Sequence, residues 1–502
     1  MEIPTLENRY PAHLPADGFR RCEPVAAADP ELLLWNRDLA AELGIDNESP
    51  DSQRTARLWT GTELPEGTVP IALAYAGHQF GQPVPQLGDG RAVVLGQLTD
   101  RSGRRHDLQL KGSGPTPFSR GGDGRAALGP VLREFVVSEA MHALGIPTTR
   151  ALAATTTGET VHRQFGPEPG AVLTRVAASH LRFGSFEYYA HRGDTAGLRC
   201  QADTTIEWHF PALRAQPAPM RYLALLRAVM ERTATLVNEW LRVGFIHGVM
   251  NTDNMTLSGE TLDYGPCAFM DHFRPDRVYS SVDRHGRYAW NQQPRMAHWN
   301  LARLAECLLP LLDEDDNAAV DAAEAVLGEY PDRFAIGHDH MLARKLGLAA
   351  TEDDPRCAGS TVSELGERLL ALMARHEVDF TNTWRLLMQG PPDNREQVER
   401  LREWFDHDEG VEDWLADYAG RLRAQGIEET ARIRRMTAAN PAVIPRNHRV
   451  EMALEAARGG DLAPTRRLID ALQTPYQSPE GFPELALPPG PREIVPATFC
   501  GT

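Results

Sequence analysis

The spacing of hydrophobic residues divides the chain into a strand-rich first part and a helical second part. Short apolar runs at residues 91–98 and 107–111 lie on either side of a polar turn, which predicts a β-hairpin. A helical pattern then begins at Pro130 and ends at Gly145. Further strand-like segments follow at residues 148–155 and 171–176. Strands with one helix between them predict a small β-rich lobe.

Helical spacing dominates from about residue 190. In residues 220–243 apolar side chains recur every three to four positions, and Gly244 is placed to end this helix. A shorter helical pattern, residues 31–43 closed by Gly44, predicts one helix near the N-terminus. Charged helical segments are predicted at residues 361–375, 395–405, 411–425, 450–457 and 463–472.

The order of these segments predicts an α+β fold with several units. A chain of 502 residues is too long for a single hydrophobic core. We expect an N-terminal extension (1–65), a β-rich lobe (66–190), a helical lobe (191–350) and a helical C-terminal region with a proline-rich tail (351–502).

Composition narrows the classes of partner. With 42% hydrophobic and 24% charged residues, the chain is typical of globular proteins. Its formal net charge of −17 argues against binding to nucleic acid. The sequence has neither a targeting segment at its start nor an apolar run long enough to span a bilayer, so we expect no membrane partner. Six scattered cysteines without a Cys-x-x-Cys pair favour the reducing cytoplasm and argue against structural zinc.

The segment from His247 to Asn254 is typical of a protein-kinase catalytic loop with one substitution. Kinases carry His-Arg-Asp-Leu-x-x-x-Asn, in which the Asp accepts the substrate proton and the Asn binds metal. His247 and Asn254 keep this spacing, but Val249 occupies the place of the Asp and cannot accept a proton. The motif therefore indicates metal-nucleotide binding without ordinary phosphorylation.

Asn254 and Asp263 are candidate metal ligands. Two short segments around a Ser-Gly turn separate them and predict a hairpin that brings them together. Their oxygens suit Mg²⁺ beside phosphate. A turn built by Asn and Asp is the alternative for each residue alone. With Val249 excluded, Asp253 is the carboxylate left to act as a base.

A glycine turn and a possible ion pair precede this motif. Gly88 and Gly90, followed by Arg91, lie before the first hairpin strand, where backbone N–H groups can approach phosphate. Lys111 ends a strand and Glu134 lies on the next helix, as in the kinase lysine–glutamate pair. Taken singly, these are more often a plain turn, a surface lysine and a solvated glutamate.

A second glycine-rich loop and two arginines add to the anion-binding character of this lobe. The loop at residues 112–125 contains Asp123 and Gly124 and is richer in glycine than a connector needs to be. Arg175 and Arg182 add two cations, although each alone is more often a surface arginine.

The chain resembles the selenoprotein O family, protein adenylyltransferases with a kinase-like bilobal fold. The matching strings cover about residues 70 to 275 and recur near Asn440 and His448. The strings are Tyr75-Ala-Gly-His-Gln-Phe-Gly81, Leu87-Gly-Asp-Gly-Arg91, Leu108-Gln-Leu-Lys-Gly-Ser-Gly-Pro-Thr-Pro117, Leu173-Thr-Arg-Val-Ala-Ala-Ser-His180, His247-Gly-Val-Met-Asn-Thr-Asp-Asn254 and Asp263-Tyr-Gly-Pro266.

This resemblance implies transfer of AMP from ATP to Ser, Thr or Tyr hydroxyls of proteins, with ATP flipped relative to ordinary kinases. It implies Asp253 as base, Asn254 and Asp263 as ligands of Mg²⁺ or Mn²⁺, and a Glu134 ion pair with Lys111. We expect a monomer. A nucleotide-binding pseudokinase scaffold and UMP transfer from UTP stay open as alternatives. The implied nucleotide contacts are Gly88, Gly90, Arg91, Lys111, Asp123, Gly124, Arg175, Arg182 and Asp263.

The resemblance also draws attention to two cysteines. Eukaryotic members often carry selenocysteine near the C-terminus, where this chain has Cys500, which suggests a bacterial-type member. Cys267 stands just after Asp263, where kinase-like folds have a mobile segment. A disulfide between Cys267 and Cys500 would hold the tail over the site and switch activity off. Two unrelated thiols are the alternative.

Overall fold

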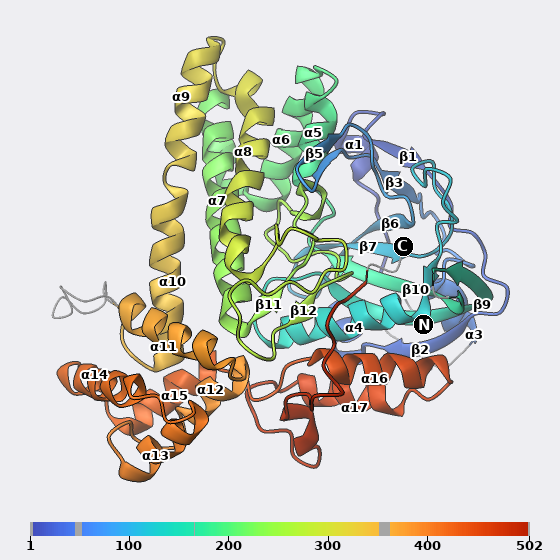
Figure 1. Ribbon diagram of the computed structural model, residues 1–502. Coiled ribbons are helices and arrows are strands. Elements are labelled where there is room, and N and C mark those ends of the chain that lie inside the picture. The colour runs from blue at the N-terminus through green and yellow to red at the C-terminus, as the bar shows by residue number, and fades with distance from the viewer. Residues whose placement is uncertain (1–3, 46–52, 165, 351–361, 500–502) are drawn as a thin grey trace.

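The computed structural model describes residues 4–45, 53–164, 166–350 and 362–499. Helices and an antiparallel sheet make an α+β fold, as predicted (Figure 1). Within these ranges the largest sheet has eight strands, in the order β1-β3-β6-β7-β10-β9-β2 with β8 beside β10. Its strands are β1 (Phe19–Arg21), β2 (Glu31–Trp35), β3 (Ile71–Leu73), β6 (Ala92–Thr99), β7 (Arg105–Lys111), β8 (Ala126–Ala127), β9 (Arg150–Arg163) and β10 (Gly166–Ala177).

The central hairpin β6–β7 and the helix that follows it are confirmed. Lys111, the last residue of β7, lies opposite Ala92 on β6 and Leu173 on β10, so neighbouring strands fix it on both sides. Helix α4 (Leu128–Ala143) packs on β9 and β10 and ends before Gly145, whose φ of 75° is the left-handed conformation of a helix cap. Because α4 packs on β10, which pairs with β7, the helix comes close to Lys111.

The predicted helix at residues 31–43 is wrong in its first half. Residues Glu31–Trp35 form strand β2, which pairs with β9 at the sheet edge, and only Arg37–Glu42 form a helix, α2. The Asn36 side chain accepts a hydrogen bond from Leu39 N at 3.1 Å and starts α2 there. A short apolar run fits a helix or a strand equally well, and pairing with the free edge of β9 makes this run a strand.

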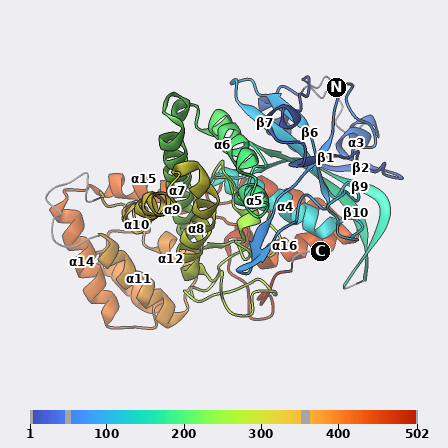
Figure 2. The ribbon, with the colours of Figure 1, turned by 90° about the horizontal axis from the view of Figure 1, so that it is seen from above.

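The helical lobe lies beside the sheet and is built around one long helix (Figures 1 and 2). Helix α7 (Ala218–Val243) matches the predicted 220–243 helix and ends at the left-handed Gly244, with φ of 72°. It packs against α8 and α10. The other helices of this lobe are α5 (Phe183–Ala190), α6 (Thr195–His209), α8 (Gln293–Leu312), α9 (Asp316–Leu327) and α10 (Tyr330–Leu346). Two lobes of this composition are consistent with a kinase-like arrangement.

The C-terminal helices divide between two places. Helices α11 to α15 lie at the far end of α10, away from the sheet (Figure 1), whereas α16 and α17 pack on α4. Leu132, Leu454 and Leu468 share one hydrophobic core there, and Arg133 forms an ion pair with Glu451. The bounds are α11 (Val362–His376), α12 (Phe380–Leu386), α13 (Arg395–Trp404), α14 (Gly410–Ala424), α15 (Glu429–Ala439), α16 (Asn447–Arg458) and α17 (Ala463–Leu472). Thus the end of the chain supports the β-rich lobe.

No helix in the described ranges combines the length and the apolar character that crossing a membrane requires.

Candidate functional site

The predicted catalytic loop follows directly from α7. A two-residue strand, β11 (Phe245–Ile246), pairs with β12 (Ala268–Phe269) and leads into His247. The buried His247 ring donates from Nε2 to the Leu262 carbonyl oxygen at 3.0 Å and accepts from the Val249 N–H at 3.3 Å. Burial lowers the pKa of His247, so the ring is neutral and keeps this tautomer. His247 thereby ties the loop to the residue before Asp263.

Asn254 and Asp253 share one 3₁₀ turn, η2 (Thr252–Asn254). The Asn254 amide nitrogen donates to the Val249 carbonyl oxygen at 3.0 Å, which leaves the amide oxygen for a ligand. Asp253 is 8% exposed, and its Oδ1 is buried without a hydrogen-bond partner. Burial raises the pKa of Asp253 to about 6, so the carboxylate is a stronger base than an ordinary aspartate and is still mostly ionised at neutral pH.

Asp263 adopts a left-handed backbone with φ of 69°. Such a conformation is rare outside glycine and is concentrated at functional sites. Burial acts to raise the pKa of Asp263, but the cations Lys111 and Arg175 outweigh it, so the net shift is strongly downwards. The predicted hairpin before Asp263 is only partly confirmed, since it is reduced to one bridge, Met255 with Thr261.

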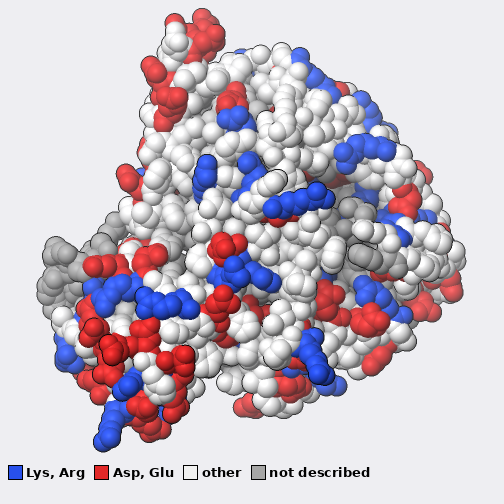
Figure 3. All heavy atoms as spheres, in the orientation of Figure 1, with Lys and Arg blue, Asp and Glu red and all other residues white. Residues whose placement is uncertain are grey.

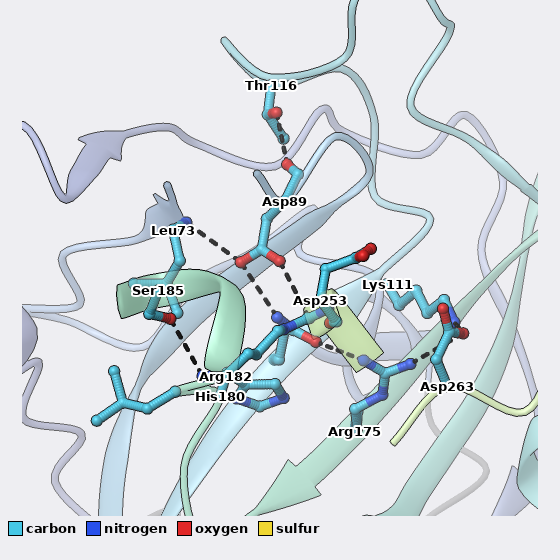
Figure 4. A network of polar contacts seen from close by, with 12 residues as sticks. Leu73, Asp89, Lys111, Thr116, Arg175, His180, Arg182, Ser185, Asp253 and Asp263 are labelled. Carbon is cyan, nitrogen blue, oxygen red and sulfur yellow. Dashed lines mark hydrogen bonds and ion pairs between the residues drawn. The ribbon is translucent and has the colours of Figure 1, made fainter. Parts of the chain in front are cut away.

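Glu134 joins the two cations. Its carboxylate accepts from Lys111 Nζ at 2.6 Å and from Arg175 Nε at 2.8 Å, and Lys111 also forms an ion pair with Asp263 (Figure 4). Burial acts to raise the pKa of Glu134, whereas Arg175 and Lys111 lower it more, so the group is ionised. The four side chains come from α4, β7, β10 and the loop after the catalytic turn, and each is oriented by an opposite charge.

Hydrogen bonds join the two glycine-rich loops, residues 87–91 and 112–125, to each other. Thr116 Oγ1 donates to the Asp89 carbonyl oxygen at 2.6 Å, and Ser119 donates to the Gly90 carbonyl oxygen. Gly88 has φ of 95°, and a methyl group there would lie 2.5 Å from the Phe118 ring. Glycine is therefore required at this close approach. Arg91 follows and adds to the positive field on Asp263.

Arg182 bridges the glycine loop and the catalytic turn (Figure 4). Its guanidinium donates to the Asp253 carbonyl oxygen at 2.9 Å, pairs with Asp89 at 3.4 Å and lies 4.5 Å from the centre of the Tyr75 ring. Sequence reasoning gave no role to Asp89 or Tyr75. Both residues lie inside the strings that carry the family resemblance, which was the available signal.

Asp123 and Gly124 lie on the second glycine-rich loop, residues 112–125. The exposed Asp123 carboxylate accepts from Arg163 Nη1 at 2.8 Å, on the end of β9. Gly124 has φ of 64°, and a methyl group there would meet the Gly114 carbonyl oxygen at 2.1 Å. The contact of Asp123 with nucleotide therefore stays a prediction, whereas Gly124 has a clear conformational reason to be glycine.

A small hairpin, β4 (Gly77–Gln79) with β5 (Gln82–Val84), packs on the catalytic turn and was missed as a site element. The His78 N–H donates to Thr252 Oγ1 at 2.7 Å, and the Phe80 N–H donates to Asn251 Oδ1 at 2.9 Å. A methyl group at Gly77 would lie 2.5 Å from Asp253 Oδ1. The hairpin thus fixes the position of Asp253.

The structure describes one of the two cysteines of the predicted redox pair. Cys267 is a free, buried thiol, and burial raises its pKa to about 12. Cys500 lies outside the described residues. Thr498 donates to the Pro266 carbonyl oxygen at 2.6 Å and its N–H donates to the Tyr279 carbonyl oxygen at 2.7 Å. The tail therefore reaches the segment that contains Cys267, and the pairing itself stays a prediction.

Comparison with known proteins agrees with this geometry. The family model described as "Protein adenylyltransferase SelO" matches residues 7–473. The chain belongs to the SelO family. It is 52% identical over 498 residues to a protein nucleotidyltransferase YdiU of Rhizobium leguminosarum, covering 99% of this chain and 97% of the relative. It is 53% identical over 505 residues to the one of Methylorubrum extorquens, covering 99% of each chain.

Membership of the SelO family makes this chain a nucleotidyltransferase that acts on protein and nucleotide substrates. Within the described ranges no three His, Cys, Asp or Glu side chains form a metal-binding group. A site made by Asn254, Asp263 and nucleotide phosphates does not need one, because Mg²⁺ takes few protein ligands when phosphate is present. The donor set thus fits a hard divalent cation.

Proposed function

We propose that this chain transfers AMP from ATP to Ser, Thr or Tyr hydroxyls of other proteins in the cytoplasm. The observation that supports this most is Asp253, whose buried and unpartnered Oδ1 stands next to Asn254 on one turn. A base beside a metal ligand suits group transfer more than passive binding of nucleotide.

In this proposal the acceptor hydroxyl gives its proton to Asp253 while its oxygen attacks the α-phosphorus, and pyrophosphate leaves. ATP is oriented with its α-phosphate towards Asp253. Lys111, Arg175 and Arg182 hold the phosphates from the β-rich lobe, with Glu134 keeping the first two in place. Mg²⁺ or Mn²⁺, held by Asn254 and Asp263, would neutralise phosphate charge. The remaining nucleotide contacts are Gly88, Gly90, Arg91, Asp123 and Gly124.

Labelled ATP tests this reaction. With ATP labelled on the α-phosphate, we expect label on acceptor protein, and with ATP labelled on the γ-phosphate we expect none, because pyrophosphate is released. Label from the γ-phosphate alone would show a kinase, and no label from either would favour a nucleotide-binding scaffold. A parallel incubation with labelled UTP decides whether UMP is transferred instead.

A redox test addresses the cysteine pair. If Cys267 and Cys500 form a disulfide that holds the tail over the site, dithiothreitol should raise the transfer rate of the wild type but not of Cys500→Ala. Peptide mapping without reductant should find the two cysteines linked after oxidation. Cys22→Ala, at a cysteine remote in sequence from both, is the matched control and should respond to reductant as the wild type does. Equal stimulation of wild type and Cys500→Ala would argue against this pair.

A further inference from the structure

Two arginines flank the β4–β5 hairpin beside the proposed base. At the hairpin turn, a methyl group on Gly81 would lie 3.4 Å from Arg287 Nη2. At the other end, Arg192 Nη1 lies 3.4 Å from the Pro85 carbonyl oxygen. The exposed residues Gln82 and Pro83 lie between them. Both arginines therefore border the same outward-facing strand.

Aromatic rings hold these cations in place. The guanidinium of Arg287 lies 4.7 Å from the centre of the Trp299 ring, and that of Arg303 lies 4.9 Å from it. Arg192 lies 3.5 Å from the centre of the Tyr188 ring. Stacking on a ring fixes a guanidinium without neutralising its charge. Arg192 also donates to neutral acceptors, the Tyr188 and Pro85 carbonyl oxygens and Gln86 Oε1, so its charge stays available to an anion.

Carboxylates do not balance this charge. Among the contacts of the described residues, Arg192 and Arg287 form no ion pair, and Arg303 pairs with Glu306, which is 54% exposed. The Nε atoms of Arg287 and Arg303 are buried without a hydrogen-bond partner. Burial lowers the pKa of the adjacent His78, and Arg303 and Arg287 lower it further, although Glu306 acts in the opposite direction.

The wider surface makes this concentration of positive charge unusual. The chain carries a formal net charge of −17. In Figure 3 basic side chains gather over α8 and the loops before it, whereas the end of α9 is mainly acidic and the lower left part carries both signs. A local basic surface on an acidic protein indicates a partner of opposite charge.

The surface is close enough to the reaction to meet the acceptor itself. The Gln79 side chain hydrogen-bonds to Asp253, and Gly81 comes two residues later in the hairpin turn, so their Cα atoms are at most about 7 Å apart. A polypeptide whose hydroxyl reaches Asp253 therefore places its neighbouring residues on this hairpin.

We propose that Arg192, Arg287, Arg303 and Trp299, here called the arginine patch, bind an acidic stretch of the acceptor protein next to the modified hydroxyl. This inference rests on the proposed function, since it names the class of acceptor for the same site. Side chains carry the recognition, because Pro83 has no N–H with which to extend the hairpin by another strand.

Two series of synthetic peptides test the arginine patch with the full chain and α-labelled ATP. Each peptide carries one Ser, one Thr and one Tyr, flanked by Asp and Glu in one series and by Lys in the other. We expect the acidic series to be labelled at least about tenfold faster at low salt, and the difference to shrink as salt screens the charges. In Arg192→Glu/Arg287→Glu the preference should reverse, with ATP affinity and the labelling of a third peptide with uncharged flanks unchanged.

Controls separate this inference from the proposed function. Arg395→Glu, at the exposed first residue of α13, makes the same kind of charge change far from the site and should keep the acidic preference. If the double variant folds poorly, Arg287→Gln takes its place. This change removes charge without adding repulsion and should lose part of the preference for acidic peptides. Equal labelling of both charged series, or of neither while the uncharged peptide is labelled, would overturn the arginine patch. Absence of α-label on every peptide, the uncharged one included, would instead overturn AMP transfer.

Discussion

Replacement of Asp253 by alanine is expected to lower the rate of AMP transfer by about 10²–10⁴-fold, the usual contribution of a positioned general base. ATP binding should stay measurable, because a base acts on the reaction more than on the ground-state complex. Single-turnover transfer from α-labelled ATP measures the first quantity, and equilibrium binding of ATP measures the second.

Two further variants show whether the loss comes from the carboxylate. Asp253→Asn keeps the shape of the side chain next to Gly77 and should lose nearly as much activity as Asp253→Ala. Asp263→Ala should weaken metal-dependent ATP binding as well as transfer, since it removes a proposed ligand. Full activity in Asp253→Asn would mean that another group accepts the proton.

Replacement of Glu134 by alanine is expected to destabilise the fold by about 3 kcal/mol, the lower end for a broken buried ion pair, because Asp263 remains as a second carboxylate beside Lys111 and Arg175. The rate of AMP transfer should fall about as much as it does in Lys111→Ala, which removes the other partner of the same ion pair. In the double variant Lys111→Ala/Glu134→Ala the losses should be smaller than the sum of the single ones by about 0.5–3 kcal/mol. Unfolding in urea with transfer rates checks both.

An exposed ion pair provides the comparison for this cluster. Glu396 pairs with Arg400 on α13 at 2.8 Å and is 81% exposed, so Glu396→Ala should cost less than about 1 kcal/mol. If Glu134→Ala costs no more than Glu396→Ala, the buried cluster does not hold the site together. Strictly additive losses in the double variant would mean that Lys111 and Glu134 act separately.

The sequence predicted the parts of the site that depend on local order. The β6–β7 hairpin, α4 and α7 follow from residues close together in the chain, and each is bounded by a turn or a left-handed glycine. The spacing of His247 and Asn254 predicted one loop, and His247 indeed connects it to Leu262. Short-range patterns are sufficient for such elements because their hydrogen bonds are local.

Long-range packing explains what the sequence did not predict. Residues 31–35 became a strand because β9 offers an open edge more than a hundred residues later. The β4–β5 hairpin was not predicted as part of the site, because only the fold brings it to Asp253. The ion pair between Asp123 and Arg163 could not be predicted from their spacing in the sequence either. Contacts between distant segments leave no periodic trace in the residues that make them.

The packing of α16 and α17 on α4 has a consequence for how the protein matures on the ribosome. Helix α4 carries Glu134, yet the residues that cover its outer face, on α16 and α17, follow it by about three hundred residues in the chain. Until they emerge, that apolar face has no partner within the nascent chain, which exposes a surface of the kind that chaperones bind. The helix that carries Glu134 is therefore fully supported only after the helical lobe, with Asp253 and Asp263, has been synthesised.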